Sequence, residues 1–514
     1  MNILKLNLLL QNKYVGIILV LISGLLTGIA LLQMNPWLIW FSLIPLFLVV
    51  PNHSIKKSIL YGGLFGLIVG SILLSWIFST ITIYSGTETL LGIPIFILIC
   101  IYYSIYPLIF SVLYSLLLKK KNIRYSSVLT TVLIGAILWV ILEWIRINIL
   151  ISIPWVIHTV AISQLKSLYG IQLVSITGQW GISFLIVVVN LLFALAIKHY
   201  KLKYGIYALS TVVLFYFSGF VIFNLFDPSA GKKIKVAIIQ ENIKAHTRWN
   251  ESNGDRLAQE LIDLNYEAAN YNPDLIVWSE TVLPWPYLPN DDLINIAVDI
   301  TKESNPEHII GILTKVETDT TKLYNSAYLI NSDGVAVSRY DKVNLLSFLE
   351  RPFLSKDLKV PFLSESNYTN MVQGSNHEPL KGRYANMGVL ICNESISPDE
   401  AKRTLKRGAN LLITLSNDAW VEGTHLIDIH FYASRLRAVE SGKDIIINSN
   451  CGIGGIISGN GTIQVQNSSQ YPVCITGEAR IRNYSTLYTN FGDWFIYLSM
   501  LILLIFMYWF KFAT

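Results

Sequence analysis

Long apolar runs are the feature that most constrains the fold of this chain. They lie near residues 14–33, 37–51, 59–83, 90–118, 127–151, 181–197, 204–225 and 493–510. Most of them reach the roughly 18–20 residues that a helix needs to cross the hydrocarbon core of a bilayer. One such run is consistent with a buried core helix, but eight in one chain predict about eight membrane-spanning helices. The first run is followed directly by others, so it is not interpreted as a cleaved signal peptide.

The apolar residues are unevenly distributed along the chain. The whole sequence is 53% hydrophobic and 14% charged, whereas globular domains carry about 25% charged residues. The excess falls before residue 227 and at the C-terminal end, and the composition between them is that of a soluble domain. We therefore expect a transmembrane bundle of about seven spans over 1–226, a soluble-type catalytic domain over 232–484, and a C-terminal transmembrane helix over 491–514. The net charge of +5 does not suggest a nucleic-acid partner.

Basic residues follow the apolar runs alternately. They gather before residue 14 and at 56–57, 119–124 and 198–203. The other connections are nearly free of them: 34–36 and 84–89 contain no Lys or Arg, and 152–180 contains only Lys166. Because basic loops stay in the cytoplasm, this alternation predicts that residues 232–484 lie on the opposite, extracytoplasmic side.

The middle segment alternates β-branched apolar stretches with helical patterns. Helices are expected near 251–269, 291–304, 398–407 and 426–441. The predicted strands are "KVAIIQ", "DLIVWSE", "HIIGIL", "NSAYLI", "VAVSRY", "MGVLICNE", "NLLITLSND", "DIIINSN", "GGIISG" and "TIQVQN". Such alternation is typical of an α/β layered domain. Neither a GxGxxG fingerprint nor a GxxxxGK phosphate loop is present in the sequence.

Three chemically active residues follow the ends of apolar strands. They are Glu280, Lys342 and Cys392. Catalytic groups of α/β sheets gather beyond the carboxyl ends of the strands, so we expect these side chains to meet. A cysteine thiol is mostly protonated at neutral pH, and Glu280 is placed to remove its proton. Lys342 and a backbone N–H after the cysteine are suited to stabilise an oxyanion.

Each of these residues also has an ordinary interpretation. Glu280 alone is equally consistent with a surface ion pair, Lys342 alone with a solvated lysine, and Cys392 alone with a small buried apolar residue. Their shared placement favours catalysis. The sequence contains no C-x-x-C or H-E-x-x-H spacing, so neither a metal nor another cofactor is predicted.

The segments "VWSETVLPWP", "YDKVNLLSFLE", "GVLICNES" and "LSNDAW" resemble those of the nitrilase superfamily. That resemblance implies a four-layer αββα sandwich with a Glu–Lys–Cys triad. Such a domain between several membrane spans and one final span is similar to the apolipoprotein N-acyltransferase family. The resemblance covers essentially the whole chain, and chain order, domain insertion and topology agree with it.

The resemblance implies a two-step acyl transfer without a cofactor. The cysteine takes an acyl chain from a phospholipid, typically phosphatidylethanolamine. The thioester then acylates the free amino group of a diacylglyceryl-cysteine lipoprotein. The expected location is the bacterial cytoplasmic (inner) membrane, with the catalytic domain on the periplasmic side.

The resemblance also assigns roles to residues of this chain. Glu280 corresponds to the general base, Lys342 to the oxyanion lysine and Cys392 to the nucleophile. Supporting positions in the active site are Glu350, Glu394 and Asn417. Positions at the substrate entrance are Trp249 and Trp420.

The apolar segment from Leu345 to Leu354 directly follows Lys342. A transferase must keep water from its thioester, and this segment is the best local candidate for a lid. Phe348 is its aromatic member, and Glu350 is expected to point back at the site.

Two further pairs leave alternatives open. Glu143 and Arg146 lie on one face of the fifth span, where they either pair with each other or place Arg146 against a phospholipid headgroup. Cys451 and Cys474 lie in the outer domain, where a disulfide is possible, although two free thiols are favoured.

Three functions compete on the sequence. The first is a membrane acyltransferase. The second is a membrane-tethered, nitrilase-like amidase that hydrolyses a small amide, although a single anchor would suffice for it. The third is a transporter or a non-catalytic lipoprotein-binding scaffold. Most spans lack ionisable or helix-breaking residues in matched positions, which disfavours transport, and the complete Glu–Lys–Cys set disfavours a scaffold.

Overall fold

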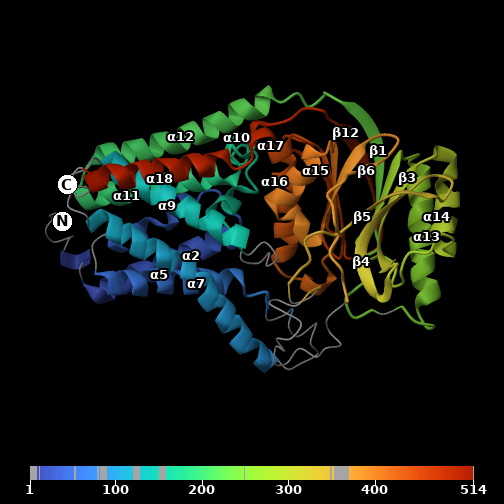
Figure 1. The fold of residues 1–514 in the computed structure, drawn as a ribbon, viewed down its shortest axis with the longest axis horizontal. Coiled ribbons are helices and arrows are strands. Elements are labelled where there is room, and N and C mark those ends of the chain that lie inside the picture. The colour runs from blue at the N-terminus through green and yellow to red at the C-terminus, as the bar shows by residue number, and fades with distance from the viewer. Residues whose placement is uncertain are drawn as a thin grey trace.

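The protein consists of a helical bundle joined to a layered α/β domain, as Figure 1 shows. The computed structural model describes residues 8–10, 12–50, 54–77, 80, 89–119, 128–149, 158–247, 249–347, 350–351 and 370–512. Both chain termini lie at the end of the bundle farthest from the sheets (Figure 1).

The bundle is built from the apolar runs. Its elements are α2 (Lys13–Leu32), α3 (Ile39–Ser42), α4 (Ile44–Val49), α5 (Ile55–Leu73), α7 (Thr89–Lys119), α9 (Val128–Ile149), the short η3 (Val160–Gln164) and α10 (Val174–Thr177), α11 (Gln179–His199), α12 (Leu202–Leu225), α17 (Leu487–Phe491) and α18 (Trp494–Phe512). In the described part of the chain, six helices are long and apolar enough to cross a membrane. The two remaining predicted spans correspond to shorter apolar segments, Ile39–Val49 and Trp494–Tyr508, so a count of eight is not confirmed.

The α/β domain contains two six-stranded sheets. The first has the order β12-β1-β2-β3-β4-β5 and the second the order β11-β10-β9-β8-β7-β6. The strands of the first sheet are β1 (Lys232–Gln240), β2 (Leu275–Trp278), β3 (Glu307–Val316), β4 (Asp319–Ile330), β5 (Ala336–Asp341) and β12 (Val473–Ile481). Those of the second are β6 (Leu380–Lys381), β7 (Asn386–Ile391), β8 (Leu411–Asn417), β9 (Ile445–Asn450), β10 (Gly454–Ile457) and β11 (Ile463–Asn467).

Helices cover the outer face of each sheet. The helices are α13 (Gly254–Asn270) and α14 (Asp292–Thr301), which the short η4 (Lys302–Ser304) extends, on the first sheet, and α15 (Pro398–Lys406) and α16 (Leu426–Ser441) on the second. The order of layers in Figure 1 is therefore helix, sheet, sheet, helix, with α15 and α16 on the side of the bundle. A core of apolar side chains from both sheets fills the space between them. This arrangement agrees with the sandwich that the sequence predicts.

Strands that run in parallel bring their carboxyl ends to one rim of the sandwich. β1 and β2 are parallel in the first sheet, and β7, β8 and β9 are parallel in the second. Four non-glycine residues just after these strands adopt left-handed backbone conformations: Asn242, Thr281, Cys392 and Cys451, with φ between 52° and 54°. Residues held in this region are strained and gather at functional sites. The rim is therefore where a site is expected.

The bundle and the α/β domain share one apolar core. Leu346, Trp420, Val421 and Leu426 of the domain belong to the same buried cluster as side chains of α2, α5, α7 and α11. The ring of Trp420 packs edge-on against that of Trp76, just beyond α5, with centroids 5.9 Å apart. The rim of the sandwich is thereby fixed against the membrane helices.

Glu143 and Arg146 of α9 do not pair directly. Glu143 accepts hydrogen bonds from the Trp139 indole and the Val160 N–H, each at 3.0 Å. Arg146 donates to the carbonyl of His158 and lies over the Tyr106 ring, 4.7 Å from its centroid. Of the two alternatives left open by the sequence, the mutual ion pair is therefore not the one formed.

Candidate active site

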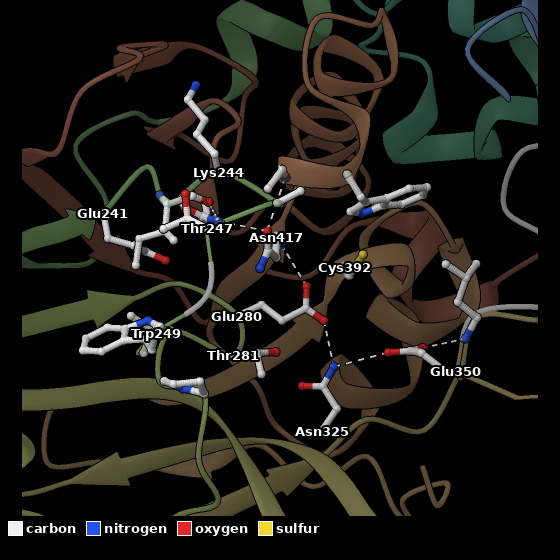
Figure 2. A pocket seen from close by; sticks show the side chains of 18 of the residues that line it. Glu241, Lys244, Thr247, Trp249, Glu280, Thr281, Asn325, Glu350, Cys392 and Asn417 are labelled. Atoms are coloured by element: carbon white, nitrogen blue, oxygen red, sulfur yellow. Dashed lines mark hydrogen bonds between the residues drawn. The ribbon is translucent and has the colours of Figure 1, made fainter. Parts of the chain in front are cut away.

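A cavity of about 460 Å³ opens at the rim of the sandwich. Among the residues that line it are all three expected catalytic side chains, Glu280, Lys342 and Cys392. Figure 2 shows Glu280 pointing toward Cys392 from the opposite wall. Sequence reasoning from strand ends thus selected residues that the fold brings together.

Cys392 is the first residue of η6 (Cys392–Ser395), the 3-10 turn that follows β7. Its φ of 52° turns the chain sharply where the buried strand ends. The residue is only 5% exposed. Burial, followed by the nearby Glu280 carboxyl, raises the pKa of the Cys392 thiol well above its usual value. The thiol is therefore protonated at neutral pH, and it becomes nucleophilic only when a base takes its proton.

Glu280 is held by two hydrogen bonds that leave it beside the cysteine. Its Oε1 accepts from Asn325 Nδ2 at 2.7 Å, and its Oε2 accepts from the backbone N–H of Asn417 at 2.8 Å. Burial raises the pKa of Glu280 above that of an ordinary glutamate, although Lys342 partly opposes the shift. A carboxylate with a raised pKa is a stronger base, which suits the removal of a thiol proton.

Lys342 is 1% exposed and lies between two carboxylates. Its Nζ donates to Glu350 Oε1 at 2.8 Å and lies 3.8 Å from Glu280 Oε1. Burial alone would lower the pKa of Lys342, but the surrounding acidic groups, Glu350 first, raise it above its usual value. Lys342 is therefore a fixed positive charge in the cavity wall, as oxyanion stabilisation requires.

The other expected residues take different positions. Glu350, Asn417, Trp249 and Trp420 line the cavity. Glu394 does not line it: Glu394 is fully buried and accepts backbone N–H bonds from Ile391, Val343 and Asn344 at 2.8–2.9 Å. Phe348 and half of the segment Leu345–Leu354 fall outside the described residues.

Several residues of the site were missed by sequence reasoning. Asn325 donates to Glu280 and, at 3.3 Å, to Glu350, so it joins the two carboxylates. Glu241 lines the cavity, and burial raises its pKa to about 7. Lys244, also on the cavity wall, forms an ion pair with Glu422. The sequence offered no clear signal for Asn325, because β4 reads DTTKLYNSAYLI and Asn325 stands beside another polar residue.

The four cysteines are free thiols, which settles the open alternative for Cys451 and Cys474. In the part of the chain that the structure describes, no cluster of three or more His, Cys, Asp or Glu side chains is arranged to hold a metal ion.

Two family models match consecutive parts of the chain. Residues 23–192 match the apolipoprotein N-acyltransferase N-terminal domain. Residues 235–477 match the carbon-nitrogen hydrolase family. The first match lies within the bundle, and the second spans the sandwich from β1 to β12.

Curated relatives are similar over most of their length. An apolipoprotein N-acyltransferase of Geobacter metallireducens is 26% identical, covering 89% of this chain and 88% of the relative. The apolipoprotein N-acyltransferase of Allorhizobium ampelinum is 30% identical, covering 70% of this chain and 69% of the relative. The apolipoprotein N-acyltransferase of Photobacterium profundum is 24% identical, covering 92% of this chain and 91% of the relative.

Solved structures are similar to about half of the chain. A carbon-nitrogen hydrolase from Helicobacter pylori is 15% identical, covering 48% of this chain and 89% of that one, with a TM-score of 0.36. The NitFhit protein of C. elegans is 18% identical, covering 49% and 62%, with a TM-score of 0.38.

Proposed function

This chain belongs to the apolipoprotein N-acyltransferase family, and we propose that it transfers its acyl group in two steps through Cys392. The protein is an N-acyltransferase that acylates lipoproteins, and it is a multi-pass membrane protein of bacterial type. The observation that carries the proposed mechanism is the meeting of Glu280, Lys342 and Cys392 in one cavity beside the membrane helices.

In the first step, Glu280 takes the proton from the Cys392 thiol, and the thiolate attacks an ester carbonyl of a phospholipid. Lys342 and the backbone N–H of Asn393 stabilise the oxyanion of the tetrahedral intermediate. The intermediate collapses to a thioester on Cys392. The leaving alkoxide takes the proton from Glu280, and a lysophospholipid departs.

In the second step, the free α-amino group of a diacylglyceryl-cysteine attacks the thioester. Glu280 takes a proton from the attacking nitrogen. The C–S bond then breaks, and the Cys392 thiolate recovers its proton from Glu280. The products are an amide on the lipoprotein and the free enzyme.

The location of the cavity supports a lipid substrate. Trp420 lines the cavity and also packs on Trp76 beside α5, so the site adjoins the bundle. We propose that residues 232–484 are the catalytic domain, between a bundle over 1–226 and a final helix over 491–514. The basic loops support an inner-membrane protein with a periplasmic domain, and phosphatidylethanolamine is the proposed donor. A tethered amidase does not need this contact between site and bundle.

Intact mass spectrometry tests the thioester. Purified protein incubated with phospholipid alone should gain the mass of one acyl group, and Cys392→Ala should abolish the gain. Cys451→Ala is the matched control, because Cys451 is a second buried cysteine in the same rim, and it should keep the gain. Addition of a diacylated lipopeptide should then discharge the adduct onto the peptide. An unchanged mass in the wild-type protein under turnover conditions, or release of free fatty acid only, would contradict the proposed transfer.

A further inference from the structure

The end of β8 and the turn after it position Glu280, the proposed general base, through a backbone hydrogen bond. The backbone N–H of Asn417 donates to Glu280 Oε2 at 2.8 Å, as the dashed line in Figure 2 shows. Asn417 is the last residue of β8, so the position of this N–H depends on the turn that follows. The next residue, Asp418, is 1% exposed and is the centre of the turn.

Asp418 is fixed by hydrogen bonds to both its side-chain oxygens and its backbone N–H. Its Oδ1 accepts from Ser416 Oγ at 3.0 Å and its Oδ2 from Ser449 Oγ at 2.8 Å. Its backbone N–H donates to the carbonyl of Asn450 at 2.8 Å. A side chain at Gly452 would place a Cβ 2.6 Å from Asp418 Oδ2, so glycine is required beside it. The turn therefore has little freedom while Asp418 keeps its partners.

His430 is a close hydrogen-bonding partner of Asp418. Its Nδ1 lies 2.7 Å from Asp418 Oδ1, and the two side chains are 7% and 1% exposed. His430 belongs to α16, which packs against the η6 turn that carries Cys392. The other charged groups that act on the imidazole are Glu280, after β2, and Lys342, after β5. Burial lowers the pKa of His430, but Asp418 and, to a smaller extent, Glu280 together raise it above the usual value.

We propose that His430 and Asp418 form a buried ion pair that positions the Asn417 N–H on Glu280 and cancels the charge of Asp418 beside the catalytic pair. This inference rests on the proposed roles of Glu280 and Cys392. Neither His430 nor Asp418 lines the cavity, so both are positioning residues. A neutral histidine that merely fills space is the competing interpretation.

Removal of the imidazolium has a predictable electrostatic effect. His430→Asn leaves the Asp418 carboxylate without a counter-charge, next to Cys392 and Glu280. A nearby like charge raises the pKa of an acid, so the thiol and the base should both hold their protons to a higher pH. Asp418→Asn should not do this. A buried histidine without its carboxylate is neutral, so no uncompensated charge remains.

The test is the pH dependence of Cys392 alkylation by iodoacetamide, measured on the full-length protein in detergent by peptide mass. The midpoint for His430→Asn should rise by about one pH unit, which is the effect of one added like charge. Asp418→Asn and the double variant should stay within about 0.3 pH unit of wild type, since neither leaves an unpaired charge. Alkylation needs no lipid, so failure of the proposed acyl transfer would leave this test intact.

His308→Asn is the matched control. His308 is a fully buried histidine of the same domain, but its Nε2 lies 2.9 Å from the Thr301 hydroxyl rather than from a carboxylate. Its replacement should leave the midpoint unchanged. An unshifted midpoint in His430→Asn, or an equal shift in the double variant, would overturn the proposal.

A measurement on the wild-type protein removes the dependence on variant folding. Nitrogen-15 spectra of labelled histidine should show an imidazolium at pH 7.5 that is absent from the spectrum of His430→Asn, which separates it from His377 beside Glu400. Spectra in which every histidine is neutral at that pH would equally overturn the ion pair.

Discussion

At the scale of single residues, two glutamates near the nucleophile, half-buried Glu350 and fully buried Glu394, have different roles. Glu350 bonds a side chain and a loop: its Oε1 accepts from Lys342, and its Oε2 accepts from the Leu346 N–H at 2.7 Å. Glu394 bonds mostly the backbone, and its Oε1 also accepts from the Tyr340 hydroxyl at 3.0 Å. Glu350 therefore sets the charge around Lys342, whereas Glu394 ties the turn after β5 to the turn that carries Cys392.

Glutamine at these two positions should separate the roles. Glu394→Gln puts an amide nitrogen where at least one backbone N–H needs an acceptor, and a buried unsatisfied donor costs about 1–3 kcal/mol. Thermal and denaturant unfolding should show that loss of stability. Glu350→Gln should slow thioester formation at least roughly tenfold, because Lys342 loses its nearest counter-charge. It should cost stability as well, since the amide nitrogen then faces the donors from which Glu350 accepts. Thioester formation slowed equally in the two variants, per folded protein, would contradict this division.

At the scale of elements, the contact between Trp76 and Trp420 joins α5 to the loop that lines the cavity. His425, in the same loop, lies 3.0 Å from the carbonyl of Leu73 at the end of α5. The loop is therefore held from the membrane side as well as from within the sandwich.

Trp76→Ala should weaken acylation by phospholipid several-fold, because the cavity wall at Trp420 loses its support from the bundle. Alkylation of Cys392 by iodoacetamide should change little, since the small reagent does not depend on that wall. Trp37→Ala is the matched control: Trp37 belongs to the same bundle but is 63% exposed, and its loss should leave both rates unchanged. A Trp76 variant that acylates at the wild-type rate would show that this contact does not shape the lipid path.

The pattern of apolar strands predicted most of the sandwich, because strand ends and helix patterns are local properties. The predicted span 37–51 shows the limit. It forms two short helices, with Pro45 in the first turn of the second. Backbone groups at the break between them are hydrogen-bonded by Asn190 of α11, which accepts from the Leu43 N–H and donates to the Ile39 carbonyl. A break stabilised by a residue far along the chain leaves no local signal.

The same reasoning separates the predictable part of the site from the rest. Each of the three catalytic candidates, Glu280, Lys342 and Cys392, follows a strand that its apolar, β-branched sequence pattern predicts. Asp418 and His430 act through each other and through a backbone N–H, which only the assembled sheets bring into register. Their contribution could not be seen before the fold was known.

At the scale of the whole molecule, the α/β domain is attached to the bundle at separated points. Lys166 pairs with Asp428 at 3.3 Å. Arg435 donates to the Leu165 carbonyl at 2.9 Å, and Gln172 donates to that of Asn460, also at 2.9 Å. Asp428 and Arg435 lie on α16 and Asn460 follows β10, so the domain is attached to the bundle through more than one of its elements.

Single-cysteine labelling tests the proposed orientation. In a protein without its native cysteines, Thr320→Cys should react with an impermeant thiol reagent added outside the inner membrane. Thr320 is exposed and is the second residue of β4, just after the turn that follows β3. Lys121→Cys, in a basic loop outside the described residues, should react only after the membrane is opened. The reverse pattern would place the site on the cytoplasmic side and contradict the positive-inside prediction.

The several attachments between domain and bundle hold Cys392 at one position relative to the helices. If the nucleophile does not move toward its substrates, each reacting group must reach it at that level. Reactivity should then depend on how far an amine stands from the lipid surface as well as on its chemistry. Such an enzyme would acylate an amine held at the membrane surface, but it would not acylate the same amine on a longer polar spacer.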